Sequence, residues 1–241
     1  MEKILFINAC IRDCSRTLRL ARHLLDRLAI AAAGNFDSTV RENSGSDAAG
    51  NSDSAAVGKY DSNAGQIRRA AVEEVDLRKE KIQAITSFDP LERRERMVRE
   101  GRTDAPELKY ARQFADADTI VIAAPYWDLA FPAILKIYLE QVTVTGVTFR
   151  YSPEGRPVGM CKARRLFYVM TSGGPAIFNM GYDYICTLCR NFFGIEDIRL
   201  FKAENLDIAG NDPEQIMASA LACVDKAAEA EAEAEAEEKK L

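Results

Sequence analysis

The segment from 119 to 140 constrains the fold more than any other part of the chain. It reads TIVIAAPYWDLAFPAILKIYLE, in which an apolar run over 120–124 is followed by Pro125 and, from Pro132, by residues with helical spacing. A short and continuously apolar run is typical of a strand that helices cover on both faces of a parallel sheet. The segment therefore predicts a strand, a turn and an amphipathic helix within an open α/β sheet.

The alternation of strands with helices continues along the whole chain. Strands are predicted over 4–7, 71–77, 119–124, 165–171 and 195–201, and helices over 15–33, 91–100, 107–115, 132–142, 180–193 and 213–227. Residues 147–152 fit either a short strand or an extended loop, and 154–159 have the composition of a turn. This alternation predicts a doubly wound, five-stranded parallel sheet in the flavodoxin-like order 2-1-3-4-5, with 71–77 at its edge.

Composition indicates a single domain over 1–227 with an insertion and a tail. Hydrophobic residues make up 47% of the 241 residues, which is enough for one core. Residues 34–66 are rich in Gly, Ser, Asn and Asp, and they cannot bury enough apolar surface to offset the entropy of ordering. We predict a mobile insertion there. The alternating Glu and Ala of 228–241 predict a charged tail in the form of a frayed, solvated helix.

Charge and hydropathy argue against several classes of protein. The net charge is −5 without a basic stripe, which disfavours a nucleic-acid partner. No apolar run reaches the ~18 residues that a membrane span needs. The first residues read as a strand and not as a secretion signal, so we expect a cytoplasmic protein with reduced cysteines. The single His23 cannot make a His-rich metal site, and Cys186 and Cys189 are interpreted as buried, inert thiols.

Polar side chains and free backbone follow the first predicted strand. In this first loop, residues 8–17, Ser15 and Thr17 place hydroxyls at a helix N-terminus, and Arg12 and Arg16 add positive charge. A helix N-terminus with such side chains favours an anion such as a phosphate. The alternative is that Ser15 is an ordinary N-cap. The loop contains neither a Walker motif nor a G-x-G-x-x-G fingerprint.

Two further loops follow the strands 119–124 and 165–171. The second loop, residues 125–130, carries Tyr126 and Trp127; because successive side chains alternate, we expect one of them to face a crevice, although core aromatics are the alternative. In the third loop, residues 171–175, Gly173 and Gly174 let the backbone approach a ligand, unless this is an ordinary turn. In flavodoxin-like order the three loops converge, and they match the phosphate, the ring and the polar ring edge of a flavin mononucleotide (FMN).

The residues of 124–159, APYWDLAFPAILKIYLEQVTVTGVTFRYSPEGRPVG, resemble the flavin loop, helix and GVTF segment of the flavodoxin-like NAD(P)H:quinone oxidoreductases and FMN-dependent azoreductases. The resemblance extends to the first loop, to VMTSGGP at 169–175 and to FFGI at 192–195. Cys10 stands where relatives often have Ser, and Asp128-Leu129 replace an Asn-Phe pair. The resemblance implies FMN as the cofactor, with FAD as the alternative, bound by Cys10, Arg12, Ser15, Arg16, Thr17, Pro125, Tyr126, Trp127, Asp128, Leu129, Thr171, Ser172, Gly173 and Gly174.

The resemblance also implies an activity. Family members pass a hydride from NAD(P)H to FMN, which then reduces a quinone, an azo compound or a similar small acceptor, so no catalytic side chain is predicted. Relatives are dimers with sites at the interface, which implies a homodimer here. A non-enzymatic FMN electron carrier and a flavin-free regulatory protein on the same fold are the alternatives.

Overall fold

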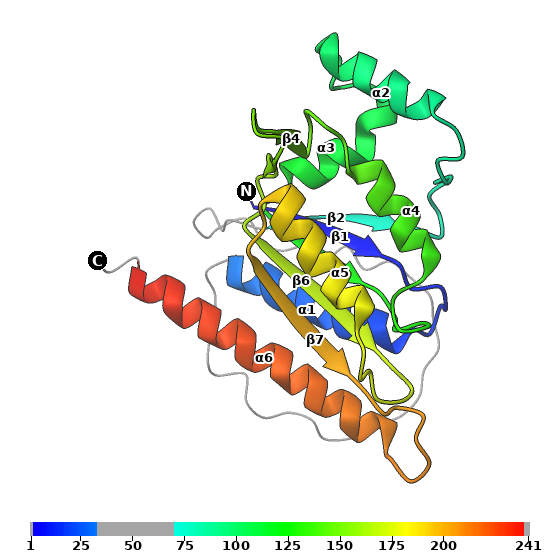
Figure 1. The fold of residues 1–241 in the computed structure, drawn as a ribbon. Helices are drawn as coiled ribbons and strands as arrows, with labels where there is room; N and C mark the ends of the chain where they lie inside the picture. Colours follow the sequence, from blue (N-terminus) through cyan, green and yellow to red (C-terminus); the bar gives the residue numbers. More distant parts are fainter. Residues whose placement is uncertain (1, 33–69, 239–241) are drawn as a thin grey trace.

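A parallel sheet forms the centre of the molecule (Figure 1). The computed structural model describes residues 2–32 and 70–238. The sheet has the order β2-β1-β3-β6-β7, and every neighbouring pair is parallel. This is the predicted arrangement, with β2 at the edge. The strands are β1 (Lys3–Asn8), β2 (Ala71–Asp76), β3 (Thr119–Ala123), β6 (Arg165–Thr171) and β7 (Asp197–Ala203).

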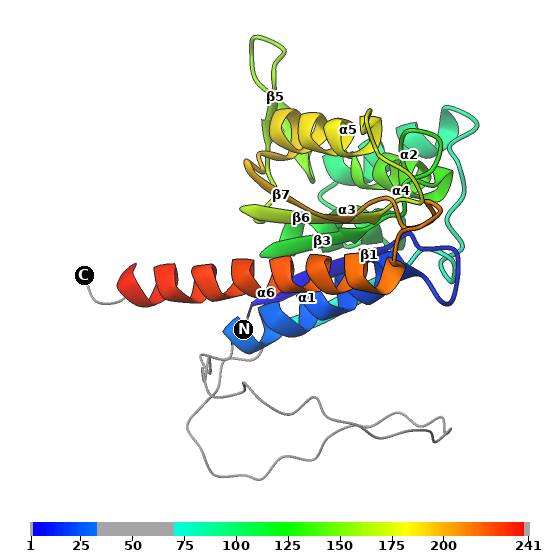
Figure 2. The same ribbon diagram turned by 90° about the horizontal axis from the view of Figure 1, so that it is seen from below.

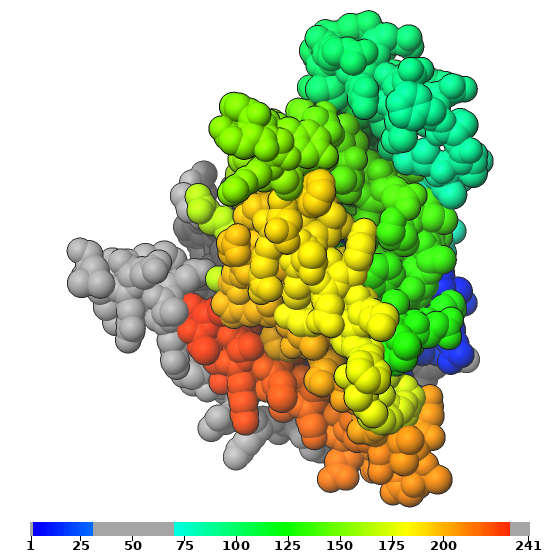
Figure 3. Space-filling model, viewed as in Figure 1, coloured from blue at the N-terminus to red at the C-terminus, as the bar shows by residue number. Residues whose placement is uncertain are grey.

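Helices cover both faces of the sheet, as Figure 2 shows edge-on. On one face lie α1 (Arg16–Ala32) and α6 (Pro213–Glu238). On the other lie α3 (Lys109–Asp116), which a 3-10 turn at Pro106–Leu108 precedes, α4 (Ala133–Val142) and α5 (Met180–Leu188). Helix α2 (Asp89–Arg99) stands at the periphery (Figure 3) and packs through Met97 on a small separate cluster.

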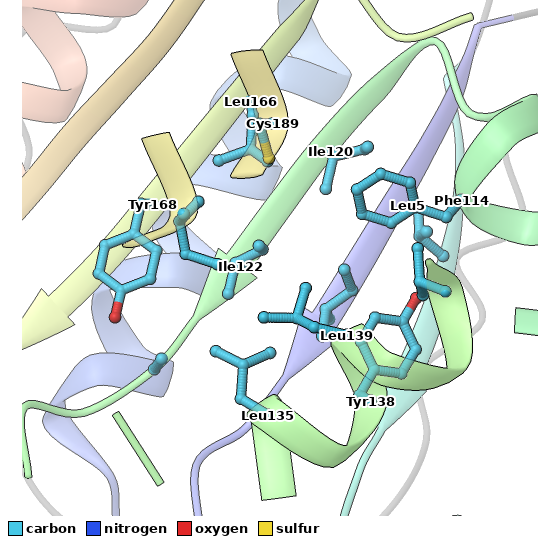
Figure 4. Packing of buried hydrophobic residues seen from close by; sticks show 14 of the residues in the cluster. Leu5, Phe114, Ile120, Ile122, Leu135, Tyr138, Leu139, Leu166, Tyr168 and Cys189 are labelled. Atoms are coloured by element: carbon cyan, nitrogen blue, oxygen red, sulfur yellow. The ribbon is translucent and has the colours of Figure 1, made fainter. Parts of the chain in front are cut away.

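The central strand β3 shows why this sequence needs two helical layers. All five of its residues are buried. Ile120 and Ile122 belong to the core beneath α3, α4 and α5, whereas Val121 and Ala123 belong to the core beneath α1 and α6. Successive side chains of a strand point to opposite faces, so an uninterrupted apolar run requires a cover on each. Figure 4 shows Ile120 and Ile122 on the α4 side of the sheet, with Leu135 and Leu139 of α4 facing it.

The segment after α4 forms a hairpin that the sequence predicted only in part. Strand β4 (Phe149–Tyr151) pairs antiparallel with β5 (Pro157–Gly159), where only a turn was predicted. A Cβ on Gly159 would lie 2.3 Å from backbone atoms of Phe193 and Gly194. The hairpin thus packs against the π-helical turn Cys189–Phe193 that ends α5, a contact between segments distant in sequence. Gly194 closes that turn with a positive φ, as a helix stop does.

Helix α6 continues through most of the predicted tail. The tail after 227 was predicted to be a frayed, solvated helix, and it is helical, because α6 runs without a break to Glu238. The part next to 227 is packed and not solvated. Ala228 is buried, and the Glu231 carboxylate forms ion pairs with Arg165 and Arg199. These contacts explain the longer helix, since they anchor a segment that composition alone describes as solvated. The predicted insertion at 34–66 lies outside the described residues.

The predicted thiol pair is buried where α5 meets its π-helical turn. Cys186 and Cys189 are both buried free thiols, as the sequence indicated. Burial raises the pKa of Cys189 far above its usual range, which keeps the thiol protonated. Within the two described ranges, no helix has both the length and the apolar character to cross a bilayer.

Candidate functional site

Thr171, the last residue of β6, connects the three predicted loops. Its carbonyl accepts a hydrogen bond from the Tyr126 N–H in the second loop, at 3.0 Å. Its hydroxyl shares a 2.7 Å hydrogen bond with the Thr17 hydroxyl in the first loop. Both threonines are buried. The three loops therefore meet at the carboxyl edge of the sheet, as predicted, and Figure 1 shows the strand arrowheads directed toward this edge.

The first loop presents a run of unpaired backbone donors. Ser15 is the N-cap of α1: its hydroxyl accepts from the Leu18 N–H at 3.3 Å, and its carbonyl accepts from the Arg19 N–H. Residues 13 and 14 form a hydrogen-bonded turn that engages the Ser15 N–H, and within the described chain the N–H groups of 11–14, 16 and 17 donate to no protein acceptor. Together with the positive end of the α1 dipole, this run is suited to an anion. The N-cap role and the anion site therefore coexist.

Cys10 lies beneath this loop and not on its surface. Its side chain is fully buried in the core under α1, with Sγ 3.8 Å from the Ala123 carbonyl. Its N–H donates to Asn8 Oδ1 at 3.0 Å. Burial raises the pKa of the Cys10 thiol to about 11. Cys10 was predicted to bind the cofactor, but neither its thiol nor its N–H is available here, because both already have partners inside the protein.

The second loop is a tight turn with strained backbone. Trp127 and Ala130 exchange two backbone hydrogen bonds, of 3.2 and 2.8 Å. Between them, Asp128 and Leu129 have φ of 49° and 68°. Two consecutive left-handed residues form the type of turn that usually contains glycine, and a bulky residue there costs free energy. Such strain is concentrated at binding sites and switch regions, so the turn is a functional candidate on backbone grounds alone.

Tyr126 and Trp127 point to different environments, as their adjacency predicted. Tyr126 packs against the core, and its hydroxyl donates to the Phe178 carbonyl at 2.8 Å. Trp127 is 40% exposed. The turn that carries it is held to the start of α5, because the Met180 N–H donates to the Leu129 carbonyl at 3.0 Å. Trp127 is therefore the aromatic ring available to a ligand, and Tyr126 is a support.

In the third loop the carbonyl groups are hydrogen-bonded within the protein, whereas two N–H groups are not. The carbonyls of Ser172, Gly173 and Gly174 accept from the N–H groups of Leu206, Asp207 and Asn205, respectively. The Ser172 hydroxyl also donates to the Gly174 carbonyl at 2.6 Å. In the part of the chain that the structure describes, the N–H groups of Gly173 and Gly174 have no protein acceptor. This loop therefore offers donors to the polar edge of a ligand.

The sequence reasoning missed a fourth loop, residues 204–212, which follows β7. Its backbone bonds to the third loop place it at the same edge, and Asp207 forms an ion pair with Arg16 of the first loop at 2.7 Å. A Cβ on Gly173 would lie 2.5 Å from Asp207 Oδ2, so this glycine leaves room for the carboxylate. The signal was present, because the carboxyl-edge rule that selected the other loops applies equally to the residues after the last strand.

The residues at this edge fit the chemistry of FMN. The free N–H groups of the first loop suit a phosphate, the exposed Trp127 ring suits a flat aromatic system, and the Gly173 and Gly174 donors suit ring carbonyls. Arg12 is exposed in the first loop and Pro125 is half-buried in the second. Of the predicted residues, Cys10, Thr17, Thr171 and Ser172 are buried, and the side chains of all four have partners inside the protein.

Comparison with known families and curated proteins shows similarity to a family with this fold and to FMN-dependent oxidoreductases. Residues 44–228 match the model of a family described as having a flavodoxin-like fold. The FMN-dependent NADH:quinone oxidoreductase of Coprothermobacter proteolyticus is 38% identical over 159 residues, which are 64% of this chain and 74% of that protein. The FMN-dependent NADH:quinone oxidoreductase 2 of Clostridium acetobutylicum is 43% identical over 128 residues, 51% of this chain and 62% of that protein.

Solved structures share the fold over most of their length. An azoreductase from Bacillus anthracis str. Sterne superposes with a TM-score of 0.69 at 23% identity, covering 95% of this chain and 99% of that one. An FMN-dependent NADH-azoreductase from Bacillus anthracis str. Ames Ancestor, solved in complex with FMN, gives 0.68 at 20% identity, covering 96% of this chain and all of that one.

Replacing Thr171 by Val should destabilise the protein by about 1–3 kcal/mol, because the buried Thr17 hydroxyl loses its partner. Thr17→Val should do the same. The double variant should cost clearly less than the sum, since two apolar groups then face each other. Urea denaturation of the four proteins measures this. Additive costs would show that the two hydroxyls do not depend on each other.

Proposed function

The chain belongs to the family with a flavodoxin-like fold, and from this we propose that the protein is an FMN-dependent NAD(P)H oxidoreductase that reduces a quinone, an azo compound or a similar small acceptor. The observation that carries the proposal is the junction at Thr171, which brings two sets of free donors, from the first and third loops, and an exposed aromatic ring to one edge of the sheet. The names of the relatives above support FMN as cofactor and NADH as the hydride donor.

The roles of the chain's own residues follow from the groups they leave unpaired. The unpaired N–H groups of the first loop and the α1 dipole hold the phosphate, with Arg16 beside them. Trp127 lines one face of the ring, and Gly173 and Gly174 donate to its polar edge, where they stabilise negative charge. When bound, FMN accepts a hydride and passes two electrons to the acceptor, so the protein supplies position and electrostatics but no catalytic side chain.

All six cysteines are free thiols in the structure. Reduced thiols are the usual state in the cytosol, where thiol-reducing systems maintain them. This supports a cytoplasmic location for the proposed enzyme.

The proposal is tested by adding FMN to the purified protein and recording the visible spectrum. We expect a stoichiometric flavin complex that NADH bleaches anaerobically and that a soluble quinone restores without a protein partner. A complex that NADH cannot reduce would favour the electron carrier. A protein that gains no flavin would favour the flavin-free alternative.

Trp127→Ala should weaken FMN binding by roughly 5- to 150-fold, the range that corresponds to ~1–3 kcal/mol of stacking on an aromatic ring. Trp127→Phe is the matched control and should keep most of the affinity, because it retains an aromatic face. Flavin fluorescence titration measures both. If Trp127→Ala binds and reduces FMN like the parent protein, Trp127 does not contact the ring.

We further propose that the protein is a homodimer, because apolar side chains surround the site on its exposed side. They come from the second loop, the segment after the third loop and α5: Trp127, Leu129, Ile177, Phe178, Met180 and Tyr184. Grouped exposed apolar residues mark interaction surfaces. A second copy of the chain is the occupant that the resemblance to dimeric relatives implies.

Phe178→Asp should shift the protein from dimer to monomer in sedimentation-velocity experiments, because a buried charge disrupts an apolar interface. Phe178 is 65% exposed and Phe88, before α2, is 62% exposed, so Phe88→Asp is a matched control that should leave the dimer intact. A parent protein that sediments as a monomer at micromolar concentration would contradict the dimer.

A further inference from the structure

Arg16 is the only residue of the first loop that forms an ion pair with the fourth loop among the described residues. Its Nη1 lies 2.7 Å from Asp207 Oδ1. Arg16 is also the first residue of α1, directly beside the unpaired N–H groups proposed to hold a phosphate. The pair therefore places a carboxylate at the phosphate end of the site, where a second negative charge is unfavourable.

Backbone contacts hold Asp207 in this place independently of Arg16. Its N–H donates to the Gly173 carbonyl at 2.8 Å, and the neighbouring Leu206 N–H donates to the Ser172 carbonyl at 3.2 Å. Its Oδ2 lies over the Cα of Gly173, in the space that a side chain would fill. The carboxylate therefore stays at the edge of the site when Arg16 moves away.

Arg16 can move away at little cost. Both side chains of the pair are substantially exposed, and an exposed ion pair contributes little net free energy because water screens it. A phosphate is a stronger partner for a guanidinium, since it accepts charge-assisted hydrogen bonds in bidentate geometry. Only Nη1 of Arg16 is engaged with Asp207, so the remaining donors of the guanidinium face no protein acceptor in the described residues.

We propose that Arg16 exchanges partners during cofactor binding, from Asp207 to the phosphate of FMN. Because Asp207 competes with this phosphate for Arg16, it lowers the affinity of the protein for FMN. This inference rests on the proposed FMN function. Asp207 thus affects how well the protein distinguishes FMN from a flavin without a phosphate. It lies in the fourth loop, which carries no part of the flavin motif.

The test compares FMN with riboflavin, which lacks the phosphate, by isothermal titration calorimetry. Asp207→Asn keeps the backbone donor and removes the charge. It should tighten FMN binding by roughly threefold to fivefold, the scale of one exposed ion pair, and leave riboflavin binding unchanged. The control is Glu214→Gln: Glu214 pairs with Arg19, one turn along α1, at 2.6 Å and with similar exposure. It should alter neither ligand.

Arg16→Gln completes the cycle. It should weaken the binding of FMN but not of riboflavin. In its background Asp207→Asn should change the FMN affinity less than in the parent protein, because only the repulsion between the carboxylate and the phosphate remains. Weaker FMN binding by Asp207→Asn, an equal change for riboflavin, or an undiminished effect without Arg16 would each overturn the exchange while leaving the FMN function standing. A parent protein that binds neither flavin would overturn the proposed function, and this inference with it.

Discussion

The shared hydrogen bond between Thr17 and Thr171 is the contact on which the arrangement of the site depends. Strands β1 and β6 are not neighbours, because β3 lies between them. Sheet pairing alone therefore does not bring the start of α1 to the end of β6. The hydrogen bond between the buried hydroxyls of Thr17 and Thr171 connects these two segments. The bond from the Tyr126 N–H to the Thr171 carbonyl connects the second loop to them. A buried hydroxyl without a partner is costly, so these loops are held together and not merely adjacent.

The site presents mainly hydrogen-bond donors, because its carbonyl groups are hydrogen-bonded within the protein and several of its N–H groups are not. The carbonyls of the third loop are bonded to the fourth loop, while N–H groups in the first and third loops remain unpaired. An edge with such donors attracts negative charge without needing lysines, which agrees with a chain whose net charge is −5. The strained turn at Asp128 and Leu129 adds an exposed aromatic ring beside these donors.

Asp207 is the exception to this polarity. A carboxylate at an anion-binding edge lowers affinity, yet backbone bonds on the third loop hold it there and Gly173 makes space for it. Its pairing with Arg16 reconciles the two observations, since the arginine neutralises the carboxylate until a phosphate competes for it. A carboxylate is also neutralised by arginine at the other end of the sheet, where Glu231 of α6 forms ion pairs with Arg165 and Arg199.

Local pattern determined the strands, their order and the positions of three loops, because the period of apolar residues and the carboxyl-edge rule need only nearby sequence. It also anticipated that Tyr126 and Trp127 would diverge. Only the tertiary structure decided that Cys10 is buried with its thiol near the Ala123 carbonyl, that 157–159 form a strand, and that α6 beyond 227 is anchored through Ala228 and Glu231. Cys10 and α6 depend on partners far away in the chain, and the hairpin that contains 157–159 packs against the distant turn 189–193. Composition at the residue itself carries no record of such partners.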